Sequence, residues 1–173
     1  MKYIFLFPTE LEAKAFVGLS PESEVVISGV GMAATAATLA SLHSSGCLDE
    51  RCVVLAGIAG VYADSVSRGE VVEVLSETTI ELPVRFRQRY DNEPLTELRG
   101  VKSNTVHRSV ADCEGADIEN MEGASLFALC RELDVRCVEI RAVSNVVGEE
   151  FALWRVDEAC TNLAHTLKRL FVD

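Results

Sequence analysis

The sequence has few histidines, an excess of acidic over basic side chains, and no long hydrophobic run. Its three histidines and six cysteines show neither zinc-site spacing nor a C-x-x-C pair, so no metal is expected. With 16 basic residues against 27 acidic ones, the net charge of −11 argues against the basic surfaces that nucleic acids require. No apolar run is long enough to span a membrane. We therefore expect no nucleic-acid partner and no membrane partner.

The length and the cysteines indicate the domain organisation and the cellular compartment of the protein. About half of the 173 residues are apolar, so the chain 1–173 is expected to form a single domain with one sizeable core. The N-terminal apolar run is too short for a signal peptide and leads directly into a polar helical pattern. Cys52, Cys130 and Cys137 lie in apolar runs, as small buried thiols do in a reducing compartment. These features predict a cytoplasmic protein.

Apolar strand patterns alternate with helical patterns along most of the chain, which predicts an α/β fold with helices covering a central sheet. The predicted strands are Lys2–Phe7, Glu24–Ser28, Arg51–Ala56, Glu70–Glu77 and Arg136–Val143. The predicted helices are Thr9–Val17, Met32–Leu42, one within Asp117–Leu133, and Arg155–Phe171. Alternating polar residues in Arg85–Tyr90 predict a further strand with one polar face, inside the irregular stretch 78–110.

Glycines or small polar residues close three of the predicted strands. These endings are Gly29-Val30-Gly31, Gly57-Ile58-Ala59-Gly60 and Ser144-Asn145. Ligands of open α/β folds bind at the carboxyl ends of strands, and glycine there lets a ligand approach the backbone. The same glycines also suit tight turns, so a ligand site and a purely structural role both remain open.

Gly29–Ala34 approximates the dinucleotide-binding fingerprint, since it follows a strand and opens a helix. That motif also requires an acidic residue at the end of the next strand. Here that strand ends in Val54-Leu55-Ala56, and Asp49 and Glu50 precede it instead. A nicotinamide cofactor is therefore disfavoured.

Glu12 and Glu122 each lie at the start of a predicted helix, where an acid has an ordinary structural use. Thr9 and Glu12 match a capping box, and an acid in a first helical turn complements the helix dipole. The functional alternatives are a general base for Glu12 and, for Glu122, a carboxylate that accepts hydrogen bonds from two ribose hydroxyls. Met121 fits either the core or the floor of a ligand site.

Asn145 and Arg141 have structural interpretations as well. Asn145 suits a turn or a helix cap, and Arg141 suits a surface or ion-paired position on a strand. Both residues also lie close to the strand ending at Ser144-Asn145, where a ligand would bind.

Four segments resemble, in order and spacing, those of the methylthioadenosine/S-adenosylhomocysteine nucleosidases of the nucleoside phosphorylase superfamily. They are Pro8–Ala13, Ile27–Thr35, Val54–Val74 and Ile118–Val147. Three further segments and one tryptophan resemble those of futalosine hydrolases, namely Val101–Val106, Asn120–Ala124, Ser144–Gly148 and Trp154. The resemblance covers most of the chain outside 78–110. It implies a nucleoside phosphorylase-like α/β fold with a mixed central sheet.

The resemblance also implies roles for single residues. Glu12 would activate water, Met121 and Glu122 would contact the ribose, and Asn145 would contact the departing base, which makes Glu12 and Asn145 the expected catalytic residues. Three further residues of the glycine-bearing segments are expected to bind substrate, namely Gly31, Ala59 and Gly60.

The implied activity is hydrolysis of the N-glycosidic bond of a purine nucleoside, with futalosine as the leading substrate and no cofactor. The implied pathway is menaquinone biosynthesis. Because relatives complete their pockets with a residue from a neighbouring subunit, we expect a homodimer or a higher homo-oligomer.

Asn145 carries chemical information of its own. An aspartic acid can donate to purine N7 while it accepts from a 6-amino group. An asparagine donates from its NH2 to a 6-oxo group and accepts from a protonated N7. Asn145 therefore favours hypoxanthine or guanine over adenine, in agreement with futalosine, which carries hypoxanthine.

The sequence departs in three places from the proteins that it resembles. The chain is short between Glu77 and Val101, Glu149-Glu150 replaces a usual Pro-Arg, and Ile58 replaces a serine of the nucleosidases. Three alternatives are therefore kept: a purine nucleoside phosphorylase, a methylthioadenosine/S-adenosylhomocysteine nucleosidase, and a non-catalytic nucleoside-binding relative. Phosphorolysis is disfavoured because Glu12 would repel phosphate.

Overall fold

The computed structural model describes residues 2–63, 65–109 and 111–172. Strands and helices alternate as predicted for an α/β fold. The strands are β1 (Lys2–Phe7), β2 (Val25–Ile27), β3 (Arg51–Val61), β4 (Val71–Thr78), β5 (Arg89–Asp91), β6 (Gly100–Thr105), β7 (Ile118–Asn120) and β8 (Arg136–Val146). The helices are α1 (Glu10–Leu19), α2 (Met32–Ser44), α3 (Gly123–Glu132) and α4 (Val156–Phe171), with short 3₁₀ turns at Val84–Phe86 and Phe151–Leu153.

The sheet is mixed and curls back on itself. Its order is β2-β1-β3-β7-β6-β4-β5, and β8 pairs with both β3 and β4. The strands β3, β8, β4, β6 and β7 therefore form a closed ring of pairings, in which β8 runs parallel to β3 and antiparallel to β4. Within the described residues β3 pairs with β1, β7 and β8, and β8 pairs with β3 and β4, so the carboxyl ends of the two long strands lie side by side.

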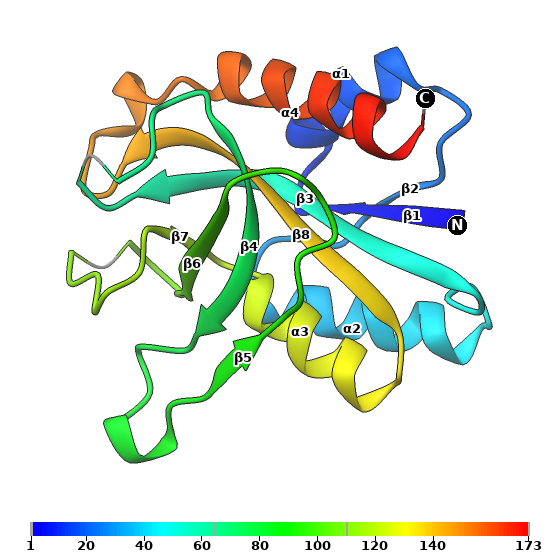
Figure 1. The fold of residues 1–173 in the computed structure, drawn as a ribbon, viewed down its shortest axis with the longest axis horizontal. Helices are drawn as coiled ribbons and strands as arrows, with labels where there is room; N and C mark the ends of the chain where they lie inside the picture. Colours follow the sequence, from blue (N-terminus) through cyan, green and yellow to red (C-terminus); the bar gives the residue numbers. More distant parts are fainter. Residues whose placement is uncertain (1, 64, 110, 173) are drawn as a thin grey trace.

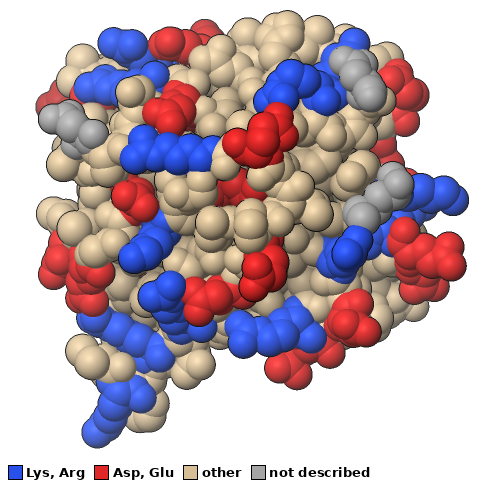
Figure 2. Space-filling model, in the orientation of Figure 1, with Lys and Arg blue, Asp and Glu red and all other residues tan. Residues whose placement is uncertain are grey.

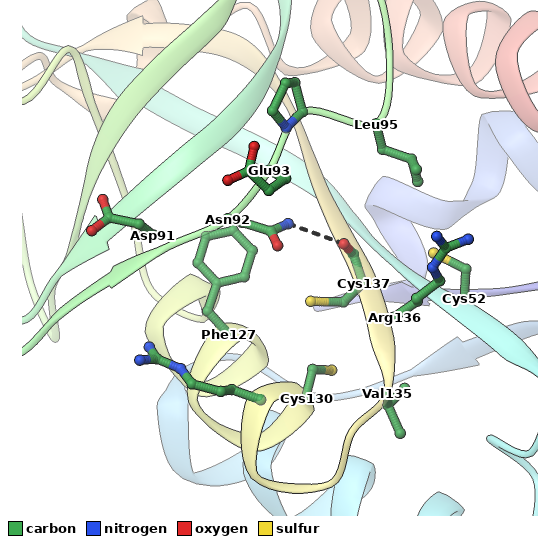
Figure 3. Close-up of a pocket in the computed structure, with 12 residues that line it drawn as sticks. Cys52, Asp91, Asn92, Glu93, Leu95, Phe127, Cys130, Val135, Arg136 and Cys137 are labelled. Atoms are coloured by element: carbon green, nitrogen blue, oxygen red, sulfur yellow. Dashed lines mark hydrogen bonds between the residues drawn. The ribbon is translucent and has the colours of Figure 1, made fainter.

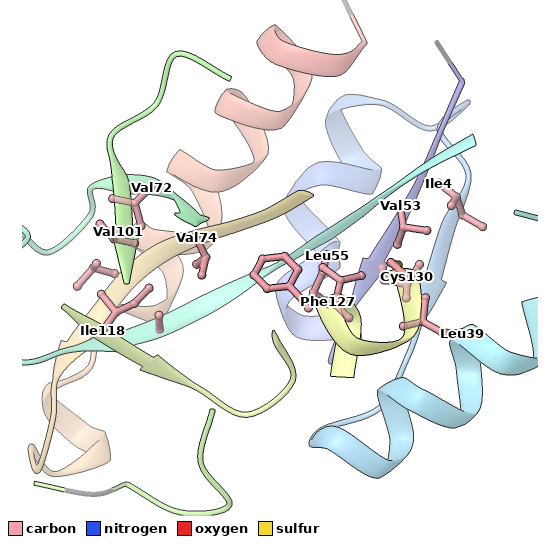
Figure 4. Packing of buried hydrophobic residues seen from close by; sticks show 14 of the residues in the cluster. Ile4, Leu39, Val53, Leu55, Val72, Val74, Val101, Ile118, Phe127 and Cys130 are labelled. Carbon is pink, nitrogen blue, oxygen red and sulfur yellow. The ribbon is translucent and has the colours of Figure 1, made fainter. Parts of the chain in front are cut away.

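Helices cover both faces of the sheet, with α1 and α4 on one side and α2 and α3 on the other (Figure 1). On the α2–α3 side, Leu39, Phe127 and Cys130 belong to one buried cluster with Val53 and Leu55 of β3 (Figure 4). A second cluster on the other side joins α1 and α4 to the sheet. Because β3 is buried on both faces, its sequence is a continuous apolar run rather than an alternating one.

Two of the expected strand ends are wrong. β3 continues through Gly57–Gly60 to Val61, and β8 continues through Ser144-Asn145 to Val146. The two strands stay paired along this extension, where Ile58 lies opposite Ala142, with one irregularity between Ala59 and Gly60. The glycine-bearing segment is therefore not a turn, because its backbone is held in the sheet.

The strand expected at Arg85–Tyr90 is also wrong over most of its length. Pro83 precedes a 3₁₀ turn at Val84–Phe86, and only Arg89–Asp91 pairs with β4. The arginines make other contacts instead: the Arg85 guanidinium lies 4.7 Å from the centre of the Phe86 ring, and Arg87 forms an ion pair with Glu114, 27 positions further along the chain. Their alternation reflects solvated side chains rather than the two faces of a strand.

The cysteines and the charged surface agree with the sequence analysis in most respects. All six cysteines are free thiols; Cys52 and Cys130 are buried, and Cys137 is half-buried. Acidic and basic side chains are interspersed on the face shown in Figure 2. Within the described residues, no helix is both long enough and apolar enough to cross a membrane.

Candidate active site

A cavity of about 390 Å³ lies at the carboxyl ends of β1, β3 and β8. Six of the residues predicted from sequence line it, namely Glu12, Ala59, Gly60, Met121, Glu122 and Asn145. Gly31 lies behind this wall, and its N–H donates to Glu122 Oε1 (2.9 Å). The cavity therefore brings together residues that are more than 130 positions apart in the chain.

Glu12 is held at the start of α1 by three hydrogen bonds, two with Thr9 and one with Ile58. Thr9 caps the helix by accepting from the Glu12 N–H (3.2 Å), and its hydroxyl donates to Glu12 Oε2 (2.6 Å). Glu12 Oε1 accepts from the Ile58 N–H of β3 (3.0 Å). The capping interpretation is thus correct for Thr9, while the Glu12 carboxylate points across to the sheet and lines the cavity.

The surroundings of Glu12 suit a general base. Burial, the largest cause, raises the pKa of Glu12 above its ordinary value of 4.5, and the charge of Glu122 raises it further. The hydrogen bonds from Thr9 and Ile58 and the charge of Arg141 act in the opposite direction. A carboxylate whose pKa is shifted towards neutrality accepts a proton more readily than an exposed one.

Glu122 immediately precedes α3 and is almost fully buried at 3% exposure. Its Oε1 accepts from Gly31, and its Oε2 accepts from Arg141 Nη2 (3.1 Å). The backbone N–H groups of Glu122 and Gly123 both donate to Asn120 Oδ1 (2.8 Å each). Asn120 therefore pairs two backbone N–H groups at the start of α3, and the Glu122 side chain lies in the cavity wall.

Of the two structural interpretations of Arg141, the ion-paired strand position is correct and the surface position is wrong. Arg141 is fully buried, and its guanidinium donates to Glu139 Oε1 (2.8 Å), Glu122 Oε2 and Asn120 Oδ1 (3.0 Å). Burial lowers the pKa of Arg141, but the charges of Glu139 and Glu122 outweigh it and the net direction is upward. Arg141 therefore stays charged and orients Glu122.

Two further carboxyl groups lie beneath α3, Glu77 of β4 and Glu139 of β8. Both side chains are fully buried, and burial is the largest cause that raises the pKa of each carboxyl group. The charge of Glu139 raises the pKa of Glu77 further. Glu139 Oε2 lacks a donor among the described groups if both carboxyls are ionised. A proton on Glu77 would supply that donor and remove one buried charge, which is the direction in which burial moves the pKa of Glu77.

Asn145 is 4% exposed and lies near the end of β8. The Ser144 hydroxyl donates to Asn145 Oδ1 (2.7 Å), and Asn145 Nδ2 donates to the Val146 carbonyl (3.1 Å). A side-chain amide has two donor hydrogens and two acceptor lone pairs, so these bonds use half of its capacity. Ser144 fixes the orientation of the amide at the cavity wall.

Several lining residues had no assigned role in the sequence analysis. They are Leu11, Val30, Val106, Ser109, Glu119, Phe151 and Val156. Trp154, noted there only as part of the resemblance, also lines the cavity, and its ring nitrogen donates to the Glu149 carbonyl (3.2 Å). Most of these residues lie in short connections without periodicity, so no sequence pattern marked them. The cavity is thus acidic at its base and largely apolar around its mouth.

A larger cavity of about 480 Å³ lies at the amino ends of β3 and β8, away from this site (Figure 3). Cys52, Cys130 and Cys137 line it, and Asn92 Nδ2 donates to the Cys137 carbonyl (3.0 Å). Burial raises the pKa of Cys52 to about 12, and the Cys130 contact and burial raise the pKa of Cys137. Protonated thiols are poor nucleophiles, so the acid-lined cavity is the candidate active site.

Known proteins resemble this chain in sequence and in fold. Residues 101–172 match the family model of the phosphorylase superfamily. The futalosine hydrolase of Thermus thermophilus is 31% identical over 217 aligned positions, which cover 99% of this chain and 96% of that protein. The alignment exceeds the 173 residues of the chain, which confirms that this protein is shorter than that relative.

Two solved structures from Helicobacter pylori share the fold at low identity. The 5′-methylthioadenosine/S-adenosylhomocysteine nucleosidase bound to butyl-thio-DADMe-Immucillin-A has a TM-score of 0.84 at 14% identity, covering 98% of this chain and 97% of that one. The native futalosine hydrolase has a TM-score of 0.83 at 14% identity, with the same coverage. These likenesses confirm the nucleoside phosphorylase-like fold. Together with the full-length sequence match, they show that this chain belongs to the phosphorylase superfamily, in the family of the futalosine hydrolases.

Proposed function

We propose that this protein hydrolyses the N-glycosidic bond of a purine nucleoside that carries hypoxanthine, with futalosine as the leading substrate. The full-length relative from Thermus thermophilus is a futalosine hydrolase, which supports both the reaction type and the substrate. The observation that carries the proposal is the position of Glu12, whose carboxylate is oriented by Thr9 and Ile58 at the wall of the cavity.

In the proposed reaction the C1′–N9 bond breaks, and its electron pair leaves with the base. The ribosyl cation that develops is stabilised by nearby carboxylates, while Glu122 accepts hydrogen bonds from the ribose hydroxyls. Glu12 takes a proton from the water whose oxygen bonds to C1′. The departing base takes a proton at N7 from solvent water, Glu12 later returns its own proton to solvent, and Asn145 Oδ1 accepts a hydrogen bond from the new N7–H. General acid–base assistance of this kind contributes roughly 10²–10⁴-fold in rate.

The charges around the cavity favour water over phosphate as the nucleophile. Glu12, Glu119 and Glu122 line it, and the nearby Arg141 is already neutralised by Glu122 and Glu139. A phosphate dianion placed beside these carboxylates would be repelled. Hydrolysis is therefore the proposed reaction, and a strict requirement for phosphate would show phosphorolysis instead.

Glu149 is a weaker obstacle to an acidic substrate than its sequence position suggests. Its carboxylate forms an ion pair with Arg68 (2.6 Å) and accepts from the Val146 N–H (3.0 Å). The local charge is therefore largely balanced, and Glu150 is exposed to solvent. This arrangement keeps futalosine, with its acidic 5′ group, as the leading substrate.

The proposal extends to the location, the pathway and the assembly of the protein. We infer a cytoplasmic enzyme of menaquinone biosynthesis in which the chain 1–173 acts as a single domain and assembles as a homo-oligomer. The apolar mouth of the cavity, which includes exposed Phe151 and Leu11, supports an additional cover from a neighbouring subunit.

The proposal is tested by incubating purine nucleosides with the protein and measuring the free base that is released. Wild-type protein should release hypoxanthine from futalosine, while Glu12→Gln and Glu122→Gln should each lose at least roughly 10²-fold in kcat. Glu10→Gln is the matched control, because Glu10 is an exposed acid in the same first turn as Glu12. Binding without turnover by the wild type would mean a non-catalytic nucleoside binder.

The identity of the base is tested with a pair of nucleosides that share one 5′ group. The wild type should prefer the hypoxanthine compound over the adenine compound by about tenfold to a hundredfold, because adenine sets NH2 against the Asn145 NH2. Asn145→Asp should narrow or reverse this ratio. A native preference for adenine would contradict the assignment of Asn145 to the base.

A further inference from the structure

Glu139 is a buried acid for which the proposed reaction has no use. It lies on β8, two positions before Arg141, and both its side chain and that of Glu77 on β4 are fully buried. A carboxylate in the interior is costly unless hydrogen bonds replace its contacts with water. The partners of Glu139 therefore indicate what the residue does.

One oxygen of Glu139 fixes the guanidinium group of Arg141. Glu139 Oε1 accepts from Arg141 Nε (2.8 Å), while Arg141 Nη2 donates to Glu122 Oε2 (3.1 Å). The two carboxylates thus bind different nitrogens of one guanidinium group. Because that group is planar and rigid, its orientation at Glu139 sets the position of the nitrogen that meets Glu122.

The other oxygen of Glu139 faces Glu77. Glu139 Oε2 is buried without a donor among the described groups, and the Glu77 carboxyl lies within hydrogen-bonding reach of Glu139. Glu139 Oε2 and Glu77 Oε1 both crowd the position that a Cβ atom of Gly123 would occupy, so the two oxygens meet beneath the first turn of α3. A protonated Glu77 can donate to Glu139 Oε2, which would hold the Glu139 carboxyl from behind.

Glu77 is itself anchored to the start of α3. Its Oε2 accepts from the Thr105 hydroxyl (2.6 Å), and Thr105 Oγ1 in turn accepts from the Ala124 N–H (2.8 Å). Its Oε1 accepts from Asn120 Nδ2. The group behind Glu139 is therefore fixed to the same helix start that follows the proposed ribose contact.

We propose that Glu139 is a positioning residue that orients Arg141 and thereby holds the Glu122 carboxylate in place for the ribose hydroxyls. Its action is indirect, because its carboxyl group contacts Arg141 rather than the ribose. The inference rests on the proposed function, since it takes Glu122 as the ribose contact. It deepens that function by making ribose recognition depend on the length of a buried side chain behind the cavity wall.

The test compares a hypoxanthine ribonucleoside with its 2′,3′-dideoxy analogue, which has the same base and 5′ group but offers Glu122 no hydroxyl. The measured quantity is the ratio of the two kcat/KM values, because the intrinsic reactivity of each sugar cancels when this ratio is compared between variants. Glu139→Asp keeps the charge but is one methylene group shorter, so it cannot reach both partners. The ratio should shrink by at least about tenfold, as for the loss of a hydrogen bond to a charged group.

Glu139→Gln is the conservative variant. Its amide oxygen can still accept from Arg141 Nε, and its NH2 can donate to Glu77, so the ratio should stay within about threefold of the wild-type value. Glu73→Asp is the matched control, because Glu73 is a fully buried acid of β4 whose carboxylate accepts instead from the backbone N–H groups of residues 95–96. This control should leave the ratio unchanged.

An unchanged ratio in Glu139→Asp, or a ratio that falls as much in Glu139→Gln as in Glu139→Asp, would overturn the inference while hydrolysis stands. If Glu139→Asp does not fold, Glu139→Leu replaces it, since leucine fills the space without a polar atom, and the same fall in the ratio is expected. If the wild type cleaves neither compound, the proposed function has failed, and the Kd values for inosine and 2′,3′-dideoxyinosine in the same variants decide instead. The same pattern in the Kd ratio would support the inference, whereas equal Kd ratios in all variants, or no binding of inosine, would refute it.

Discussion

At the scale of single residues, the site depends on how buried charges are balanced. Arg141 pairs with both Glu122 and Glu139, and burial raises the pKa of the neighbouring Glu77, which favours its uncharged form. Removing one partner of a buried pair typically costs about 3–5 kcal/mol, because the other charge is left uncompensated. Glu122 therefore has a fixed orientation before any ribose arrives.

The raised pKa of Glu12 predicts the shape of the pH–rate profile. Glu12 must be ionised to accept a proton from water, so kcat/KM should fall as the pH is lowered through a pKa above the ordinary value of 4.5. The profile of Glu10→Gln should match the wild type, since Glu10 is an exposed acid in the same turn. An acid limb at or below pH 4.5 would show that Glu12 is not the titrating base.

Burial of Glu77 predicts a stability that decreases with rising pH. The raised pKa means that the native state keeps a proton on Glu77 between the ordinary value of 4.5 and the raised value, whereas the unfolded chain loses it. The contribution to the free energy of unfolding is therefore present at low pH and is lost as the pH rises through that window.

Denaturant unfolding at several pH values measures this effect. Glu77→Gln cannot ionise, so its free energy of unfolding should fall less steeply with pH than that of the wild type. Glu132→Gln, at an exposed position on α3, is the control and should leave the slope unchanged. Parallel curves for the wild type and Glu77→Gln would mean that Glu77 is not protonated in the native protein.

At the scale of elements, β3 and β8 position the site, and a glycine in β3 makes this possible. A Cβ atom on Gly57 would lie 2.5 Å from Arg141 Nη1 and 2.8 Å from Glu12 Oε1. Only glycine lets the guanidinium and the carboxylate cross the strand at this point. The glycine-bearing segment therefore serves side chains from neighbouring elements rather than a turn.

Gly57→Ala should consequently impair catalysis more than folding. Displacement of Glu12 and Arg141 should lower kcat by about 10²-fold, while overpacking costs roughly 1–3 kcal/mol of stability. Gly18→Ala in α1 is the control, since an added Cβ there meets nothing within 4 Å and should slightly stabilise the helix. Rates and thermal melts of both variants check this, and near-normal turnover in Gly57→Ala would contradict the arrangement.

The elements also show which parts of the fold the sequence predicts well. Long periodic segments such as α4 and the apolar strand β1 are predicted closely, because burial pattern and length both identify them. The strands β6 and β7 escaped prediction, because three residues or a mostly polar sequence leave no periodic signal. Glycine in β3 suggested a turn, since the pairing with β8 that holds it is not visible in the local sequence.

The sequence likewise predicts some residues of the candidate site and not others. Glu12, Glu122 and Asn145 were found because they occupy recognisable motifs, and the structure brings them to one cavity. Glu139 was not found and the partners of Arg141 were not identified, because the importance of both residues lies in contacts between buried charges. A strand sequence does not reveal which side chains face each other across a sheet.

At the scale of the whole molecule, we expect a homodimer. The exposed residues Ala33, Ala37 and Ala40 lie at helical spacing on α2, which gives a flat face of small side chains. Light scattering at micromolar concentration should give about twice the chain mass of 18.8 kDa. Ala37→Asp should shift the protein towards monomer, whereas Thr161→Asp on the exposed part of α4 should not. A wild-type mass of 18.8 kDa would refute the dimer.

The central claim is that water, activated by Glu12, attacks the ribose carbon. The most direct measurement is release of hypoxanthine from futalosine by wild-type protein, with and without added phosphate, together with identification of the sugar product. We predict the same rate in phosphate-free buffer and in phosphate, with a sugar that carries a free hydroxyl at C1′. A rate that requires phosphate, with a sugar 1-phosphate as the product, would contradict the account.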